Sequence, residues 1–287
     1  MRGTPPLLYA SVLALLFAFG LAARAEGPRP AIIFVLAGQS NMVGKGRIAE
    51  LEPRLRRQPG NVEFYLGGAL KAMSAQESAG PEFSLAHELS NAMPDRQIVL
   101  IKYALDGSSL LDWAPEWTAE RAALTQMPQF GPLYRTLLYD IGTVVGNRPI
   151  ELGAIFWMQG ERDARFPAAA REYEANLRTL VGTLRRDLED PDLPFIFGQV
   201  NPPPAAYLGV KMVRDAQSRL PRSLPDTRLV PTDDLTKLPD QLHYDTRGQV
   251  LLGQRFARTY IARQKRARAA EADYRSHLGH TALIGGP

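Results

Sequence analysis

The sequence predicts an α/β protein, a three-layer sandwich around a five-stranded parallel, flavodoxin-like sheet. Five short apolar segments rich in β-branched or aromatic residues are typical of strands buried on both faces, as in parallel sheets. Stretches with apolar residues at helical spacing separate them. Because strand and helix alternate five times, we expect a doubly wound sheet with the strand order 2-1-3-4-5.

The predicted strands are short and end at polar or turn-forming residues. Their expected positions are residues 31–36, 97–103, 152–157, 194–200 and 228–230. The first is apolar throughout and runs directly into Gly38-Gln39-Ser40-Asn41-Met42. The fourth is followed by Asn201 and three prolines, which must form a loop because proline cannot continue a central strand.

The helices are predicted from stripes of apolar residues three and four positions apart. Residues 133–145 show the pattern simply, with Leu133, Leu137, Ile141 and Val144 on one face. The other helices are expected at residues 81–93, 173–188, 207–220 and 248–263. Residues 44–80 are irregular and dotted with glycine, so we expect a long excursion over the sheet rather than a second domain.

The first residues are typical of a secretory signal rather than of a folded domain. Arg2 precedes an apolar stretch at residues 7–21, and Ala23-Arg24-Ala25 supplies the small-x-small pattern of a cleavage site before Glu26. A retained membrane anchor is the alternative, but the stretch is short for a span, which needs roughly 20 residues. We therefore expect residues 1–25 to be a cleaved signal peptide and the protein to be periplasmic or secreted.

The rest of the chain is expected to form one domain, residues 26–268, before a poorly ordered tail at residues 269–287. Loss of the signal removes two arginines and no acidic residue, so the formal net charge falls from +4 to +2. So small a charge does not favour nucleic acid or a membrane surface as partner. The absence of cysteine excludes disulfides, thiolate nucleophiles and zinc–sulfur sites, and we expect no metal or other cofactor.

Polar residues follow most of the predicted strands, at the edge where open α/β sheets bind ligands. After the first three strands come Gly38-Gln39-Ser40-Asn41, Asp106-Gly107-Ser108-Ser109 and Gln159-Gly160-Glu161-Arg162-Asp163. Asp240 and His243 follow the fifth strand. A hydroxyl, an imidazole, a carboxylate, an amide and backbone N–H donors are the groups needed for acyl transfer through a tetrahedral intermediate.

Ser40 and His243 are the central candidates for that chemistry. A serine just past a strand more often caps a helix than attacks a substrate, so its position alone decides little. The other three histidines lie in a predicted helix or in the expected tail, which leaves His243 as the well-placed general base. Asp240 could hold its imidazole toward Ser40, with Asp234 as the reserve for that role.

Three segments carry a resemblance to a known family. They are Gly38-Gln39-Ser40-Asn41-Met42, Trp157-Met158-Gln159-Gly160-Glu161-Arg162-Asp163 and Asp240-Gln241-Leu242-His243. In this order they resemble the SGNH hydrolase superfamily, and more narrowly its sialic-acid-specific acetylesterase and acetylxylan esterase branch (carbohydrate esterase family 6-like). The resemblance runs from about residue 31 to residue 260 and implies the SGNH hydrolase fold.

The resemblance also implies a role for each residue of the site. By it, Ser40 is the nucleophile, His243 the base and Asp240 its orienting acid. The oxyanion hole would consist of the backbone N–H groups of Ser40 and Gly107 and the side-chain amide of Gln159. The segment at Gly107 is the weakest match, because an aspartate stands before it where the branch typically has a second glycine.

Several neighbours have two interpretations. The shell that supports the site is expected to contain Gln39, Asn41 and Glu161. Trp113 and Trp117 could stack on a sugar, although aromatic residues at such positions at least as often pack in the core. Asp106 could contact a substrate hydroxyl or merely begin a turn.

The sequence therefore predicts an exported serine esterase that removes acetyl groups from a carbohydrate through an acyl-serine intermediate. Two alternatives stay open: a periplasmic polysaccharide O-acetyltransferase with the same triad, and a catalytically dead sugar-binding protein. The expected partner is an acetylated carbohydrate. The sequence contains no readable code for the identity of the sugar or for the oligomeric state.

Overall fold

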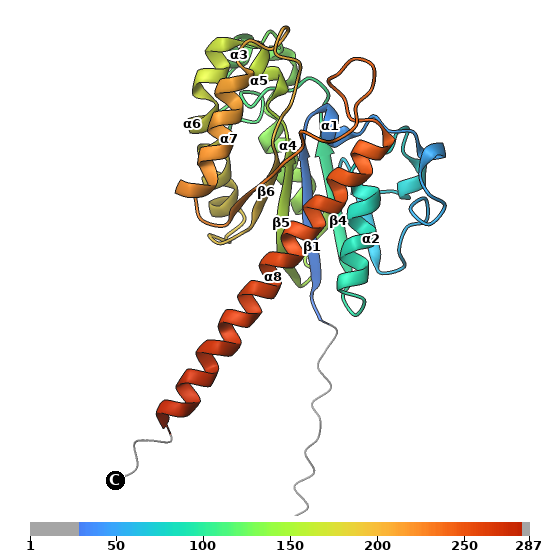
Figure 1. Ribbon diagram of the computed structural model, residues 1–287, viewed down its shortest axis with the longest axis vertical. Coiled ribbons are helices and arrows are strands. Elements are labelled where there is room, and N and C mark those ends of the chain that lie inside the picture. Colours follow the sequence, from blue (N-terminus) through green and yellow to red (C-terminus); the bar gives the residue numbers. More distant parts are fainter. Residues whose placement is uncertain (1–28, 283–287) are drawn as a thin grey trace, which may run out of the picture.

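A seven-stranded sheet forms the centre of the computed structural model, which describes residues 29–282, with side chains as far as residue 275 (Figure 1). The strand order is β3-β2-β4-β1-β5-β6-β7, and every pairing is parallel except that of β2 with β3. The strands are β1 (Ala31–Gly38), β2 (Val62–Leu66), β3 (Ala69–Leu70), β4 (Ile98–Ala104), β5 (Ile150–Met158), β6 (Phe195–Gly198) and β7 (Thr227–Val230).

The expected parallel α/β sheet is confirmed, and its strand number is corrected from five to seven. The five expected strands lie in the expected order, because β4, β1, β5, β6 and β7 are successive neighbours. β2 extends the sheet beyond β4, and β3 folds back on β2 at the edge. Both lie within residues 44–80, where an irregular excursion was expected. Only alternate residues of β2 are buried, Val62 and Phe64, so β2 lacks the continuous apolar run of a central strand.

Helices cover both faces of this sheet. α2 and α8 pack together on one face, and α4 lies behind the strands on the other (Figure 1). α6 packs against α7, which contacts β7. The helices are α1 (Ser40–Val43), α2 (Glu82–Ala92), α3 (Ala119–Ala123), α4 (Leu133–Val145), α5 (Glu161–Arg165), α6 (Pro167–Asp187), α7 (Val210–Ser223) and α8 (Thr246–Ala282), with 3-10 turns at Ile48–Glu50, Met73–Ala75 and Pro128–Phe130.

The end of α8 differs from the expectation. The helix continues to Ala282, so residues 269–282 are helical where a poorly ordered tail was expected. Residues 262–275 contain no glycine or proline and are rich in alanine and arginine, which are strong helix formers. The expected signal peptide lies outside the described residues. No helix among residues 29–282 is long and apolar enough to cross a membrane.

Candidate active site

Ser40 lies at the carboxyl end of the central strand. β1 ends at Gly38, and α1 begins two residues later at Ser40. Gly38 has φ +144°, and a Cβ there would stand 2.1 Å from the carbonyl oxygen of Met158 on β5. Since only glycine allows this close approach, the chain can turn sharply and present Ser40, which is 4% exposed, at the edge of the sheet.

The loop between β7 and α8 brings His243 and Asp240 to Ser40. His243 Nε2 lies 3.0 Å from Ser40 Oγ, and His243 Nδ1 lies 2.6 Å from Asp240 Oδ2. The other carboxylate oxygen of Asp240 accepts hydrogen bonds from the backbone N–H groups of Leu242 and His243, at 2.9 and 3.0 Å. The same aspartate thus orients both the imidazole ring and the backbone that carries it.

Asp240 is held in its charged form. Burial on its own raises the pKa of this carboxyl, but hydrogen bonds from the backbone N–H groups of His243 and Leu242, together with the His243 side chain, outweigh that effect and lower the pKa. An ionised carboxylate beside Nδ1 keeps a proton on that nitrogen and leaves Nε2 as an acceptor toward Ser40. Ser40 Oγ also lies 3.1 Å from Gln39 Oε1, a second acceptor for the same hydroxyl proton.

Asn41 links Ser40 to the loop between β7 and α8, residues 231–245, which is called the histidine loop below. Its Nδ2 donates to the carbonyl oxygen of Leu242 at 3.3 Å, and its Oδ1 accepts from the backbone N–H of Tyr244 at 3.0 Å. These two contacts bracket His243 on both sides. Asn41 Nδ2 also donates to Glu161 Oε1 at 2.7 Å. Asn41 is therefore a direct link between the ends of β1, β5 and the histidine loop.

Glu161 is a buried carboxyl in the wall of the site. It begins α5 and is 2% exposed. Burial raises its pKa, and the hydrogen bond from Asn41 partly opposes that shift. Its second oxygen, Oε2, has no hydrogen-bond partner among the described residues.

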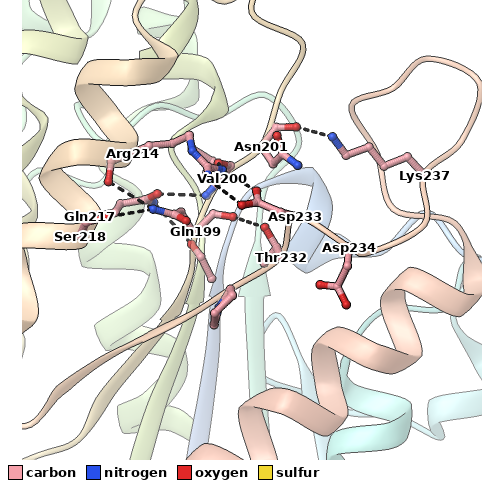
Figure 2. A network of polar contacts seen from close by, with 12 residues as sticks. Gln199, Val200, Asn201, Arg214, Gln217, Ser218, Thr232, Asp233, Asp234 and Lys237 are labelled. Carbon is pink, nitrogen blue, oxygen red and sulfur yellow. Dashed lines mark hydrogen bonds and ion pairs between the residues drawn. The ribbon is translucent and has the colours of Figure 1, made fainter.

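The histidine loop is anchored on its other side by a polar network (Figure 2). Asp233 forms a two-pronged ion pair with Arg214 of α7, and Lys237 donates to the carbonyl oxygen of Asn201. Asp234 points toward α8, where Arg255 binds it through two nitrogens and lowers its pKa to about 2. The structure therefore places Asp234 in an anchoring ion pair and places Asp240, not Asp234, against His243.

Of the expected oxyanion donors, Gly107 lies at the cavity and the Gln159 amide does not. Gly107, with φ +69°, lines the same cavity as Ser40. Gln159 is fully buried, and its Nε2 donates to the carbonyl oxygen of Ser108 and to Asp163 Oδ2. Both amide hydrogens are thus engaged, by the Ser108 carbonyl and the buried Asp163 carboxyl, and Gln159 does not line the cavity. In this respect the structure differs from the role expected for Gln159.

The two tryptophans do not form a wall of the cavity. Trp113 is fully buried, donates from Nε1 to Ser108 Oγ at 3.0 Å and packs edge-on against Trp157 at 5.2 Å between centroids. Of the two interpretations of Trp113, the structure therefore supports core packing and not stacking on a sugar. Trp117 is half-buried, and its indole nitrogen has no partner among the described residues.

A surface cavity of about 330 Å³ opens beside Ser40 and His243. Three cations line it, Lys45 from the segment after α1 and Arg162 and Arg165 from α5, and no sequence pattern predicts a binding role for them. Lys45 is neutralised by Asp106, the candidate substrate contact. Arg165 is exposed and forms no ion pair with the described residues. The lining also contains Gln39, Gly107, Glu161, Tyr207 and Leu242.

No set of three or more His, Asp or Glu side chains in the described part of the chain is placed to hold a metal ion. The chemistry available at the cavity is that of Ser40, His243 and Asp240, with backbone N–H groups nearby. A serine activated by a histidine and faced by such donors can transfer an acyl group.

A family model described as carbohydrate esterase, sialic acid-specific acetylesterase, matches residues 30–262. The chain belongs to this family. The recognition made from the sequence is thereby confirmed, as is the assignment of this esterase to the carboxylic ester hydrolases. A probable carbohydrate esterase of Arabidopsis thaliana is 27% identical over 262 residues, which cover 81% of this chain and 91% of the relative.

Solved structures show the same fold. An X-ray structure of the Arabidopsis thaliana protein has a TM-score of 0.68 at 24% identity and covers 82% of this esterase and 99% of that chain. NanS gives 0.61 at 14% identity, with 83% and 99% covered. A carbohydrate acetylesterase from Xanthomonas citri gives 0.60 at 18% identity, with 78% and 54% covered.

Proposed function

We propose that this esterase hydrolyses O-acetyl esters on a carbohydrate through an acyl-serine intermediate. The observation that carries the proposal is the continuous chain of contacts from Ser40 Oγ through His243 to Asp240, at 3.0 and 2.6 Å, in the wall of a surface cavity. The expected export of the protein belongs to the same proposal, since acetylated glycans of cell envelopes and plant walls lie outside the cytoplasm.

The first half of the reaction forms the acyl-serine. His243 Nε2 accepts the proton of Ser40 as Oγ bonds to the acetyl carbonyl carbon, and the carbonyl π electrons move to its oxygen. When the tetrahedral intermediate collapses, the bond to the sugar oxygen breaks, and His243 returns the proton to that oxygen. In the second half, water attacks the acetyl-serine with the same base, and acetate leaves.

The negative oxygen of the intermediate needs hydrogen-bond donors. In this proposal the backbone N–H groups of Ser40 and Gly107 supply them, since both residues line the cavity. Loss of one such donor typically raises the barrier by about 3–4 kcal/mol. Gln159 would join them only if its amide left Ser108 and Asp163.

The charges of the cavity bear on the kind of sugar. Lys45 is already paired with Asp106, whereas Arg165 is exposed at the rim without an ion pair among the described residues. An unpaired guanidinium can bind a carboxylate with two hydrogen bonds. A substrate screen should therefore contain acetylated acidic sugars beside neutral ones such as acetylated xylan.

Substitution of Ser40 by alanine tests the nucleophile. We expect Ser40→Ala to lower kcat for a simple acetyl ester at least about 10³-fold, because no hydroxyl remains to be acylated. The melting temperature should stay near that of the wild type. Acetate release from a panel of acetylated glycans then defines the substrate. Turnover retained by the folded variant would refute the assignment.

The purified wild-type protein distinguishes the proposed esterase from the two alternatives, an O-acetyltransferase and a dead sugar-binding protein. An O-acetyltransferase would yield an acetylated acceptor when a glycan is added, with a corresponding loss of free acetate. A dead sugar-binding protein would not react with a serine-directed phosphonate, whereas the proposed esterase should be labelled at Ser40.

The proposed export is tested separately. Mass spectrometry of the protein exported from cells that express the full chain should find Glu26 at its N-terminus.

A further inference from the structure

A buried lysine lies directly behind the helix that carries Ser40. Lys102, near the end of β4, is 1% exposed, and its Nζ donates to the carbonyl oxygen of Val43 at 2.7 Å. Val43 is the last residue of α1, which Ser40 begins. The lysine therefore binds the far end of the single turn that presents the hydroxyl.

Glu82 completes the arrangement from the opposite side. It is the first residue of α2, is fully buried, and accepts from Lys102 Nζ at 2.7 Å through Oε2. Its Oε1 accepts from the backbone N–H of Gly80 at 3.1 Å and from Gln76 at 3.0 Å. Burial lowers the pKa of Lys102, and the neighbouring Glu82 opposes that shift.

Stability is a poor explanation for such a pair. Removing two charges from water costs several kcal/mol per ion, and well-packed apolar residues in place of a buried pair are often neutral or stabilising. If position 102 served only the packing of β4, an aliphatic side chain such as that of Leu100 on the same strand would suffice. The distinctive feature of Lys102 is the polar contact that it makes with α1.

The backbone around the pair is packed too closely to shift freely. Gly44, the residue after α1, has φ +97°, and a Cβ there would lie 2.4 Å from Gly80 Cα. A Cβ on Gly80 would lie 2.5 Å from Glu82 Oε2 and 2.9 Å from Lys102 Nζ. Ser78 Oγ also donates to the carbonyl oxygen of Gly44 at 2.8 Å. The segment that holds the ion pair is thus pressed against the end of α1.

We propose that Lys102, held by Glu82, positions the nucleophile, an inference that rests on the proposed role of Ser40. Lys102 fixes the carbonyl of Val43, and the hydrogen bond from Gly44 N–H to Ser40 O at 2.9 Å closes the turn as one unit. A displacement of Val43 is therefore transmitted to Ser40 Oγ and to its contact with His243. Misplacement of a reacting group by about 1 Å can cost on the order of 10²-fold in rate.

The main test removes the pair without leaving a lone buried charge. In the double variant Lys102→Met/Glu82→Gln, methionine fills the volume, and glutamine can still accept from Gly80 N–H. We expect kcat for an acetyl ester, and the rate constant for phosphonate labelling of Ser40, to fall roughly 10- to 100-fold, with KM within about threefold. Both rates are expressed per folded molecule. Unchanged rates would overturn the proposal, whatever happens to the melting temperature.

A second variant covers the case in which the first does not fold. Gly80→Ala keeps both charged side chains but places a methyl group against them, at the 2.5 and 2.9 Å approaches described above, so that the pair must shift. It should show the same loss of kcat and of labelling rate at unchanged KM. A folded Gly80→Ala protein with wild-type rates would contradict the proposal.

Arg185 supplies a matched control. It is a buried cation, 8% exposed, that donates to the carbonyl oxygens of Leu193 and Pro225 at 3.0 and 2.8 Å, and none of these residues lines the cavity. Arg185→Met should lower the melting temperature and leave both rates unchanged; an equal loss of rate would overturn the specific role of Lys102. Failure of the wild type to be labelled at Ser40 would instead refute the proposed function itself.

Discussion

Asp240 performs two tasks with one carboxylate. Oδ2 contacts the imidazole of His243, and Oδ1 holds the backbone N–H groups of Leu242 and His243. An amide at this position can still accept the two backbone hydrogen bonds, but it would turn a donor toward Nδ1. The two tasks can therefore be separated by a single substitution.

We expect Asp240→Asn to lower kcat by about 10³- to 10⁴-fold. The amide favours the tautomer with its proton on Nε2, which cannot accept the proton of Ser40. The melting temperature should change little, because the loop keeps its backbone contacts. Steady-state kinetics with an acetyl ester and thermal unfolding measure the two effects.

Asp234→Asn is the control on the same loop. Asp234 pairs with Arg255 at the surface and does not touch His243, so its variant should keep the wild-type kcat. A large loss in Asp234→Asn together with a normal rate in Asp240→Asn would reverse the two assignments.

The sequence predicts which residues lie near the site, because the sheet topology determines that. It does not predict which way their side chains point. Ser40, Asp240 and His243 follow predicted strands, so the shared edge of the sheet brings them together. Gln159 follows β5 in the same way, yet its amide turns inward to Asp163. Trp113 likewise turns into the core. Tertiary packing decides such directions, and no local pattern encodes them.

At the scale of the element, hydrogen bonds with buried polar side chains fix the position of the loop between β4 and α3. Asp163 accepts from the backbone N–H of Leu110 through both oxygens, at 3.1 and 3.0 Å. Gln159 donates to the carbonyl oxygen of Ser108, and Asp112 accepts from Ser109. These contacts set the position of the turn that carries Gly107 at the cavity.

Burial raises the pKa of Asp163 from 3.8 to about 7, although hydrogen bonds from Gln159 and Leu110 lower it in part. Between these two values the folded state keeps a proton that the unfolded state has lost. The group therefore makes the free energy of unfolding fall as pH rises from about 4 to about 7. Above that range its effect is constant.

Asp163→Asn should remove this dependence, because an amide does not titrate in this range. We expect the free energy of unfolding of the variant, minus that of the wild type, to rise between pH 4 and pH 8. The rise is on the order of 4 kcal/mol at most, at about 1.4 kcal/mol per pKa unit. Urea unfolding of both proteins at several pH values measures it, and parallel profiles would contradict the prediction.

The elements themselves were predictable to different degrees. The long periodic pattern of α4 predicts its observed bounds, Leu133–Val145. β2 was missed because it buries only alternate residues and so lacks a continuous apolar run, and β3 because two residues give no period. α6 begins at Pro167, ahead of the expected start, since Ala169 and Ala170 are buried but too small to mark an apolar stripe.

At the scale of the molecule, α8 has two parts with different roles. Its first turns pack on the sheet: Phe256 lies 5.4 Å from Phe156, and Tyr260 lies 4.9 Å from Phe34, between ring centroids. From residue 265 to residue 275 every described side chain is exposed, and Figure 1 shows this part extending beyond the sheet. The family match also ends at residue 262.

Truncation should separate these two parts. A chain that ends at Arg268 is expected to keep the kcat and melting temperature of the full protein, because it loses no buried side chain among the described residues. A chain that ends at Arg255 loses Phe256 and Tyr260, which are at most 1% exposed. Each large aromatic residue removed from a core costs about 3–5 kcal/mol, so their joint loss approaches the 5–15 kcal/mol that typically holds a domain folded. We therefore expect that chain to be insoluble. A marked loss of stability on truncation at Arg268 would instead show that the projecting helix packs against something, and sedimentation of the full chain would reveal whether a second copy provides the surface.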